Sequence, residues 1–321
     1  MRWRQRRDLS VRLWLCRRSL HCCVRGVSFF EHEDRLHGGD KHFRLRGQQA
    51  VVETSLSIYD RLEYGGIRDE RDKLVFAQQQ EISSWHLLFP PATESQLLLE
   101  HGMHQRQAVQ FHWFNDNYGS FDEFLAGFSS RKRKSLKRER RRIEEQGLVL
   151  ERLVGDQISS EHWDFFHRCY QFTYAKRSGH GGYLTREFFT EVAAAMGEQV
   201  ILVLARDGEA PVAGALYFRS GDTLFGRYWG CLREYDCLHF EACYYQGIEF
   251  CIEHGIGRFD PGAQGEHKIQ RGFRPVQTYS NHWIADPRLS AAVEDFTHRE
   301  RPGTEAYLEE AATLLPFKQV N

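Results

Sequence analysis

The chain has 321 residues, of which 41% are hydrophobic, and its formal net charge is −1. This length is sufficient for two domains of ordinary size with a buried core. Because the charge is close to zero, a uniform electrostatic attraction to nucleic acids or membranes is excluded. The charge is nevertheless segregated, since residues 1–50 carry a net charge of +7 and residues 131–142 carry +8.

The eight cysteines form no C-x-x-C pair. This favours reduced thiols in a cytoplasmic protein over a disulfide framework or a zinc site, so we expect no bound metal. No apolar run approaches the roughly 20 residues that a transmembrane helix needs, so no membrane span is expected. The Arg-rich start contains only a short apolar stretch, residues 11–16, which is too short for a secretory signal.

Residues 1–73 have an atypical composition, rich in Arg, Cys, Trp and His, with neither a helical apolar stripe nor sustained alternation. Three interpretations remain open: a basic arm for nucleic acid or targeting, an atypical first domain, or a misassigned start or shifted reading frame. The third is favoured because local pattern and composition do not agree. Residues 1–70 are therefore expected to be loosely packed or disordered.

Regular patterns begin near Leu74. Strands are predicted over residues 82–90, 105–113 and 148–154, and helices over residues 93–101 and 121–146. Gly102 and Gly147 are predicted to end these two helices. Ser159 or Ser160 caps a further helix with aromatic residues along one side, and Thr185 caps another that ends at Gly197.

Three consecutive strands are then predicted over residues 199–206, 211–219 and 223–232. Asp207-Gly208 and Ser220-Gly221-Asp222 supply the turns that hairpins need. An apolar face at three- and four-residue spacing predicts a helix over residues 239–254. The predicted remainder comprises a strand at 256–260, a polar loop at 261–274, a strand at 275–285 and two short closing helices.

From Leu148 onward this order resembles the GNAT (acyl-CoA N-acyltransferase) superfamily. Four segments resemble the FemAB-like group of peptidoglycan biosynthesis or recognition proteins, over roughly residues 82–317: SSRKRKSLKRERR (129–141), VLARDGEAPVAGALYFRSGDTLFGRYWG (203–230), LHFEACYYQGIEF (238–250) and FDPGAQGEHKIQRGFRPVQTYSNHW (259–283). The resemblance implies an α+β, GNAT-like fold with a mixed, largely antiparallel sheet flanked by helices.

Fem-type transferases contain two GNAT-like halves, so the resemblance implies a double-GNAT arrangement here. Residues 148–321 would form the complete C-terminal GNAT-like domain. Residues 74–147 would be the remnant of the first half together with a basic helix. The first half is then expected to be incomplete.

The polar loop contains the strongest candidates for chemistry. Glu266 or His267 could accept a proton from an amine, which makes them candidate catalytic residues. The alternative is a solvated loop in which Glu266 pairs with Lys268 on the surface. Lys268 and Arg271 fit an anionic phosphate or carboxylate group, or are solvated charges. Gln264, in the same loop, is a further candidate for substrate binding.

Four other substrate-binding candidates lie earlier in the chain. His239 and Glu241 open a helix whose exposed amides would favour an anion, although Glu241 could equally interact with the helix dipole. Alternation places Arg227 and Trp229 on one face of the third hairpin strand and Tyr228 on the other. Such a face could line a substrate groove or pack within the sheet.

The basic run 131–142 places Arg131, Lys134 and Arg138 on one helical face. This stripe could bind the phosphates of tRNA, another polyanion or lipid headgroups, or could simply be solvated. The GNAT glycine run that holds the CoA pyrophosphate is replaced at residues 233–239 by REYDCLH, with no glycine and two acids. We expect no tightly bound cofactor, and an acyl donor that is acyl-CoA or aminoacyl-tRNA, with the latter slightly favoured.

The expected function is that of a cytoplasmic N-acyltransferase that moves an acyl or aminoacyl group onto the amine of a small molecule or peptide. One alternative is a non-catalytic module that binds a cell-wall precursor or RNA. The other is an inactive fragment of a longer transferase. Turnover of an activated acyl donor would separate the first from the other two.

Overall fold

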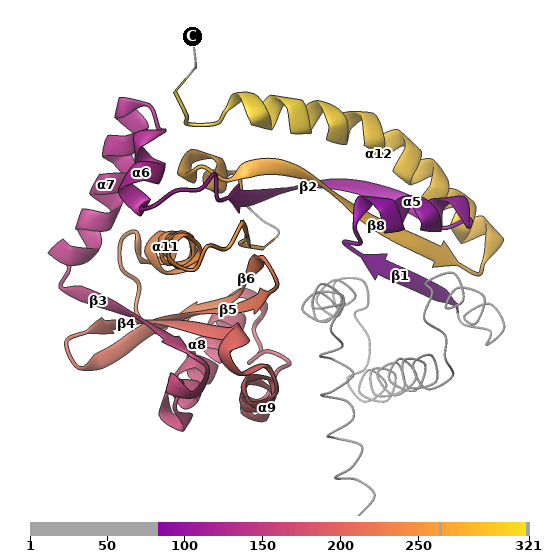
Figure 1. Ribbon diagram of the computed structural model, residues 1–321. Coiled ribbons are helices and arrows are strands. Elements are labelled where there is room, and N and C mark those ends of the chain that lie inside the picture. The colour runs from indigo at the N-terminus through magenta and orange to yellow at the C-terminus, as the bar shows by residue number, and fades with distance from the viewer. Residues whose placement is uncertain (1–82, 263–264, 319–321) are drawn as a thin grey trace, which may run out of the picture. The chain divides into compact units, whose positions relative to one another are not determined.

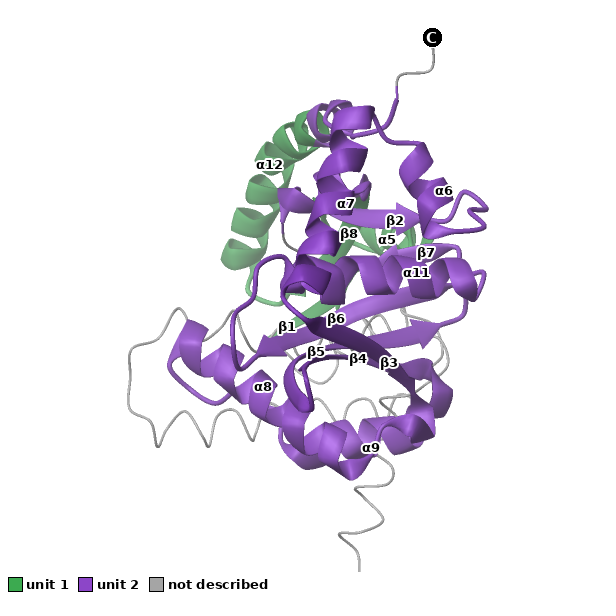
Figure 2. Cartoon of the chain, turned by 90° about the vertical axis from the view of Figure 1, so that its left-hand side faces the viewer, with its two compact units in different colours: residues 1–109, 277–307 green, residues 110–276, 308–321 purple. Residues whose placement is uncertain are grey.

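The structure is a computed structural model that describes residues 83–262 and 265–318. The predictions for residues 1–73 and for Gln264 therefore lie outside the described residues. Two compact units are present (Figure 2). Among the described residues, the first unit comprises residues 83–109 and 277–307, and the second comprises residues 110–262, 265–276 and 308–318.

The strands are β1 (Ser84–Leu88), β2 (His104–Phe114), β3 (Leu148–Val154), β4 (Val200–Asp207), β5 (Ala210–Ser220), β6 (Thr223–Cys231), β7 (Arg258–Asp260) and β8 (Arg274–Ile284). The α-helices are α5 (Ala92–Glu100), α6 (Phe121–Ala126), α7 (Ser130–Glu145), α8 (Ser160–Ser178), α9 (Arg186–Met196), α10 (Leu238–Phe240), α11 (Gln246–Glu253) and α12 (Pro287–Thr313). A π-helical turn, Glu241–Tyr245, joins α10 to α11.

The second unit is built on strands in the order β2-β7-β6-β5-β4-β3. Each neighbouring pair is antiparallel except β6 and β7, which are parallel. Helices α8 and α9 lie on one face of this sheet and α11 on the other (Figure 1). The predicted α+β class with a largely antiparallel sheet is confirmed, whereas the double-GNAT arrangement remains a prediction.

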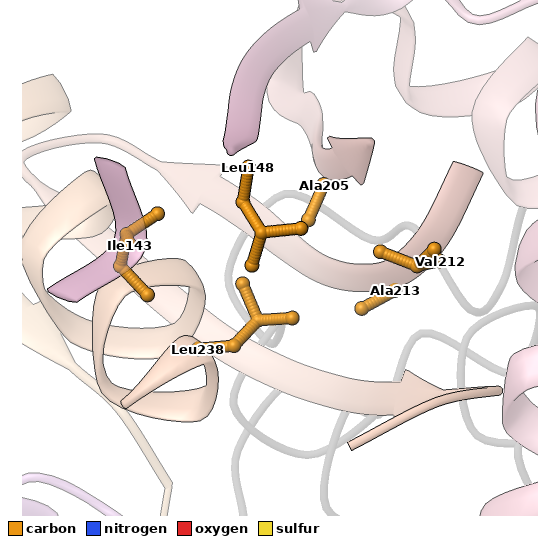
Figure 3. Packing of buried hydrophobic residues seen from close by; sticks show 6 residues of the cluster. All are labelled: Ile143, Leu148, Ala205, Val212, Ala213 and Leu238. Carbon is orange, nitrogen blue, oxygen red and sulfur yellow. The ribbon is translucent and has the colours of Figure 1, made fainter. Parts of the chain in front are cut away.

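Strand β4 is a continuous apolar run because it lies in the core of the second unit. Val200 to Ala205 are all buried, because helices cover both faces of this strand. At one end of the sheet, six apolar side chains from α7, β3, β4, β5 and α10 point toward one another (Figure 3). They are Ile143, Leu148, Ala205, Val212, Ala213 and Leu238. This cluster attaches α7 to the sheet.

In the first unit, β1, β8 and β2 are neighbours in that order. Strands β1 and β8 pair in antiparallel register, with Ser84 opposite Ile284. The unit also buries polar side chains that satisfy one another: Asn281 donates to the carbonyl oxygen of Ser95 at 2.9 Å, and its own amide oxygen accepts from the Ser95 hydroxyl at 2.7 Å. Both side chains are fully buried, so these bonds avoid the cost of unsatisfied polar groups.

Three predicted elements were wrong in detail. The single helix over 121–146 is divided into α6 and α7, because Phe128 between them is fully buried and its backbone pairs with that of Phe317. The loop 261–274 contains a 3₁₀ turn, Glu266–Arg271. The two closing helices are one helix, α12, which continues through Pro302. A proline removes one backbone hydrogen bond, and the helical turns on either side of it persist here.

The predicted helix over 239–254 is also not regular. Its first part contains the π turn, in which each backbone hydrogen bond spans one residue more than in an α-helix. The hydroxyl of buried Tyr217, on β5, donates to the carbonyl oxygen of Ala242 within this turn. The bond supplies a partner to a backbone group in the irregular segment, which the sequence pattern of the helix does not reveal.

Candidate active site

The site lies where β6 and β7 separate. Strand β7 pairs with β6 only over Thr223–Phe225, whereas β6 continues to Cys231 beside β5. At Gly226 an added Cβ atom would come within 3.3 Å of the Cα atom of Pro261. The backbone that follows β7 therefore passes directly beside β6 where it leaves the sheet. The register of β5 and β6 shifts here and gives Arg227 no partner residue in β5. Bulges of this kind redirect side chains and are frequent beside active sites.

The 3₁₀ turn that follows β7 divides the predicted loop residues into two groups. Glu266 and His267 are exposed, whereas Lys268 and Arg271 are buried. Gly265 precedes the turn with a φ of 108°, and a side chain at this position would collide with the His267 imidazole. A glycine is therefore required here for both its backbone conformation and its lack of volume.

His267 and Tyr244 form the central contact of the site. Nε2 of His267 lies 2.8 Å from the hydroxyl oxygen of Tyr244, which is on the π turn. Partial burial lowers the pKa of His267, and the positive charges of Arg271 and Lys268 lower it further. The imidazole is therefore neutral at neutral pH, which is the form that accepts a proton.

His239 completes an aromatic group around this contact. Its ring lies 5.5 Å from the Trp229 ring, 5.3 Å from the Tyr244 ring and 6.3 Å from the His267 ring, measured between centroids. Burial lowers the pKa of His239 to about 4, and His267 when protonated and the permanent charge of Arg177 lower it further. Two predicted substrate-binding residues, His239 and Trp229, are thus brought together beside the predicted base.

Lys268 is almost completely buried, with 1% of its surface exposed. Its Nζ donates to the carbonyl oxygen of Gly262 at 2.6 Å and lies 6.0 Å from the centroid of the Tyr244 ring. Burial lowers the pKa of Lys268 to about 8, an effect that nearby Asp260 partly opposes. Asp260 is itself buried, accepts from the backbone N–H of Gly262 at 2.9 Å and lies 3.5 Å from Nε2 of His112.

The remaining predicted substrate-binding residues are engaged by protein groups. Arg271 forms an ion pair with Glu139 on α7, at 2.9 Å. The buried carboxylate of Glu241 accepts from Arg140 at 2.9 Å and 3.1 Å. The guanidinium of Arg227 lies 4.5 Å from the ring centroid of its neighbour Tyr228. Their roles toward a substrate stay predictions.

Helix α7 has one face toward the site and one face toward solvent. Arg131, Lys134 and Arg138 are exposed, and none of them has an ion-pair partner among residues 83–262 and 265–318. By contrast, Lys137 pairs with Asp122 at 2.8 Å. These three cations therefore form an accessible surface without ion-pair partners in the described part of the chain, and their binding to a polyanion stays a prediction.

Sequence reasoning missed three residues of this site. Tyr244 recurs with the apolar positions of the predicted helix over residues 239–254, and this pattern does not show that its hydroxyl contacts His267. Arg177, near His239, carried no signal. Glu139 did carry one: it is the single acid among nine basic residues in 131–142, so a specific partner for it could have been sought.

Within the described residues, no group of three His, Cys, Asp or Glu side chains is arranged to hold a metal ion. The five cysteines in the same ranges carry free thiols. None of the helices described combines the length and the apolar character needed to cross a bilayer.

Several solved structures are similar to this chain in fold. L-PGS from Bacillus licheniformis shares 13% identity over 71% of this chain and 76% of that chain, with a TM-score of 0.51. FemX shares 14% identity over 70% and 80% of the two chains, with a TM-score of 0.48, and a GCN5-related N-acetyltransferase from Kribbella flavida shares 16% over 66% and 75%, with a TM-score of 0.35. At these identities the similarity concerns the fold alone.

The comparison with curated proteins gives no match. The sequence profile of the FemAB-like family, described as peptidoglycan biosynthesis/recognition, matches residues 70–319. This range is most of the chain and contains every residue of the site described above. The predicted resemblance is confirmed, and the chain belongs to the FemAB-like family.

Proposed function

We propose that the chain is an N-acyltransferase that moves an acyl or aminoacyl group from an activated donor onto an amine. The observation that carries the proposal is the contact of the His267 imidazole with the Tyr244 hydroxyl at 2.8 Å, beside His239 and Lys268. A group of basic side chains with lowered pKa values at the end of a strand is a typical acid–base site. Family membership supports a role in peptidoglycan chemistry.

In the proposed reaction the amine nitrogen attacks the acyl carbon, a C–N bond forms and the bond to the leaving group breaks. The attacking nitrogen must lose a proton. When Nε2–H of His267 donates to the oxygen of Tyr244, the lone pair of Nδ1 remains available to take that proton and to pass it to the leaving group. Burial raises the pKa of Tyr244, which keeps its hydroxyl protonated at neutral pH.

Lys268 is proposed to stabilise the negative charge that develops on the acyl oxygen. With a pKa of about 8 it remains mostly protonated at pH 7. A buried ammonium group interacts more strongly with such a charge than a solvated one, because little water screens it. Glu266, the exposed first residue of the turn, remains an alternative base.

Aminoacyl-tRNA is the donor that we favour, with acyl-CoA as the alternative. The exposed stripe of Arg131, Lys134 and Arg138 supports this choice, because phosphate backbones are bound by such rows of cations. The two acids of residues 233–239 would repel a CoA pyrophosphate less than the sequence alone indicates, because Glu234 pairs with Lys176 and Asp236 pairs with Arg142. The support for tRNA therefore depends on α7 rather than on the missing glycines.

The test is a transfer assay with the purified full chain. Two donors are offered, bulk tRNA charged with radiolabelled amino acids and radiolabelled acetyl-CoA, each with a panel of primary amines and lysine-containing peptides. We expect amide formation from the charged tRNA, and a loss of about 10²–10⁴-fold in rate in His267→Ala. His254→Ala is the matched control, because within the described residues the hydrogen bond of this histidine is local, to the carbonyl oxygen of Phe250 at the end of α11.

The outcomes separate the parts of the proposal. Transfer from acetyl-CoA but not from charged tRNA would support the N-acyltransferase activity and refute aminoacyl-tRNA as the donor. Changing Arg131, Lys134 and Arg138 to Gln should reduce the salt dependence of tRNA binding by about 2–3 in logarithmic slope, since each phosphate contact contributes about 0.7–0.9. Binding of tRNA with no transfer to any amine would instead support a recognition module.

A further inference from the structure

Arg271 has contacts that fix the turn carrying the proposed base. Its Nη1 donates to the backbone carbonyl oxygen of His267 at 2.8 Å. Its Nη2 lies 2.9 Å from both carboxylate oxygens of Glu139. Its Cζ lies 3.4 Å from the centroid of the Phe240 ring, and only 6% of the residue is exposed. These contacts leave little of the guanidinium for a substrate.

Glu139 lies on α7, and its carboxylate contacts both the turn of Arg271 and the π turn Glu241–Tyr245. Besides Arg271, its carboxylate accepts from the hydroxyl of Tyr245, on the π turn. The next residue, Arg140, forms ion pairs with Glu241 at 2.9 Å and with Glu249 at 2.6 Å. Two consecutive residues of α7 thus engage both the loop and the helix that carry the candidate site.

We propose that Glu139 and Arg271 are positioning residues: the carboxylate on α7 holds the guanidinium, and the guanidinium holds the backbone of the turn that presents His267 to Tyr244. The proposal rests on the proposed function only in naming His267 as the proton acceptor. Neither residue is assigned a contact with substrate. Arg271 acts on His267 in two ways. It holds the backbone of the turn, and its positive charge lowers the pKa of the imidazole.

The two residues have opposite electrostatic effects on the base. Within the described residues, the groups beside His267 that carry or can carry charge are Glu266, His239, Tyr244, Lys268 and Arg271. The positive charge of Arg271 lowers the pKa values of both histidines. The carboxylate of Glu139 compensates that charge at 2.9 Å. Removing the carboxylate leaves the positive charge of Arg271 uncompensated, which should lower the pKa values of the histidines. Removing the guanidinium takes that positive charge away, which should raise them.

The experiment is a histidine titration by NMR of the full chain without substrate, with the His267 signal assigned by its loss in His267→Gln. Glu139→Gln is expected to lower the pKa of His267 relative to the unsubstituted protein. Arg271→Met is expected to raise it. The double variant should return it toward the original value, and Glu139→Asp should restore it in part. Lys137→Gln is the control and should leave it unchanged, because this exposed lysine lies two residues before Glu139 and pairs with Asp122 instead.

A purely structural role would not produce shifts of opposite sign. An unchanged pKa in both single variants, or shifts in the same direction, would overturn the proposal. If Arg271→Met does not fold, Glu139→Gln and the double variant still give the comparison. In the transfer assay, Glu139→Gln should lower kcat with little change in KM, because no substrate contact is removed. Titration shifts without any transfer activity would refute the proposed function and leave the positioning role standing.

Discussion

Replacing Lys268 with methionine should stabilise the protein at neutral pH. The side chain is 1% exposed, and its pKa of about 8 lies below the ordinary value of 10.5. At about 1.4 kcal/mol for each pH unit, keeping this ammonium charged in the fold costs about 3.5 kcal/mol. Methionine fills a similar volume without charge, and it loses the hydrogen bond that the charged Nζ donates to the Gly262 carbonyl, a net contribution of about 2 kcal/mol. The expected gain at pH 7 is therefore about 1.5 kcal/mol.

The pH dependence of this gain follows from which state binds more protons. Between pH 8 and 10.5 the unfolded chain holds the lysine proton and the folded chain releases it, so the original protein becomes more stable as the pH rises. The advantage of Lys268→Met should therefore be full below pH 8 and should disappear above about pH 10.5. Thermal unfolding at pH 7 and pH 10 measures it, at about 2–4 °C for each kcal/mol.

The control for this prediction is Lys134→Met, on the exposed face of α7. No ion pair involves this lysine in the described residues, so the change should stay within about 0.5 kcal/mol at both pH values. A destabilisation of Lys268→Met at pH 7, or the same effect at pH 7 and pH 10, would refute the claim that burial of the charge costs stability. Transfer activity should fall in the same variant, since the proposed stabilisation of the acyl oxygen is lost.

Three further outcomes are expected. Gly230→Ala should lower the free energy of unfolding by about 2 kcal/mol or more in urea titrations, because the added methyl group meets the backbone of α8. Stability should fall as the pH drops from 6.5 toward 4, because His239 and His282 have pKa values lowered to about 4 and protonate more readily when unfolded; a urea midpoint that is constant over this range would contradict this. Gly265→Ala should reduce acyl transfer as strongly as His267→Ala does, because the new side chain occupies the position of the imidazole.

Much of the second unit could be predicted from local signals. The side chains of Ser159 and Thr185 accept from the backbone at the starts of α8 and α9, as their capping patterns indicated. The turns that join β4, β5 and β6 fall at the predicted glycines. These features depend on residues within a few positions of one another, which is why a sequence pattern is sufficient to place them.

The site could be predicted only in part, because its contacts connect distant positions. His267 and Lys268 were recognised by residue type and by the adjacent glycines. Arg271 was expected to bind an anion, and its partner Glu139 lies 132 positions earlier in the chain. The separation of β6 and β7, which brings Trp229 and His239 beside the turn, depends on tertiary packing. No periodicity in the sequence indicates it.

The π turn makes the site sensitive to the number of residues as well as to their identity. A π turn holds one residue more than a regular α-helix would need to join the same two flanking helices. Deleting one residue within Glu241–Tyr245 would therefore let the segment become a regular helix, with α10 and α11 close to their present positions. The side chains of the turn itself would change direction, among them Tyr244, whose hydroxyl contacts His267. In related sequences, a one-residue gap at this point would therefore distinguish chains that keep this contact from chains that lack the turn that makes it.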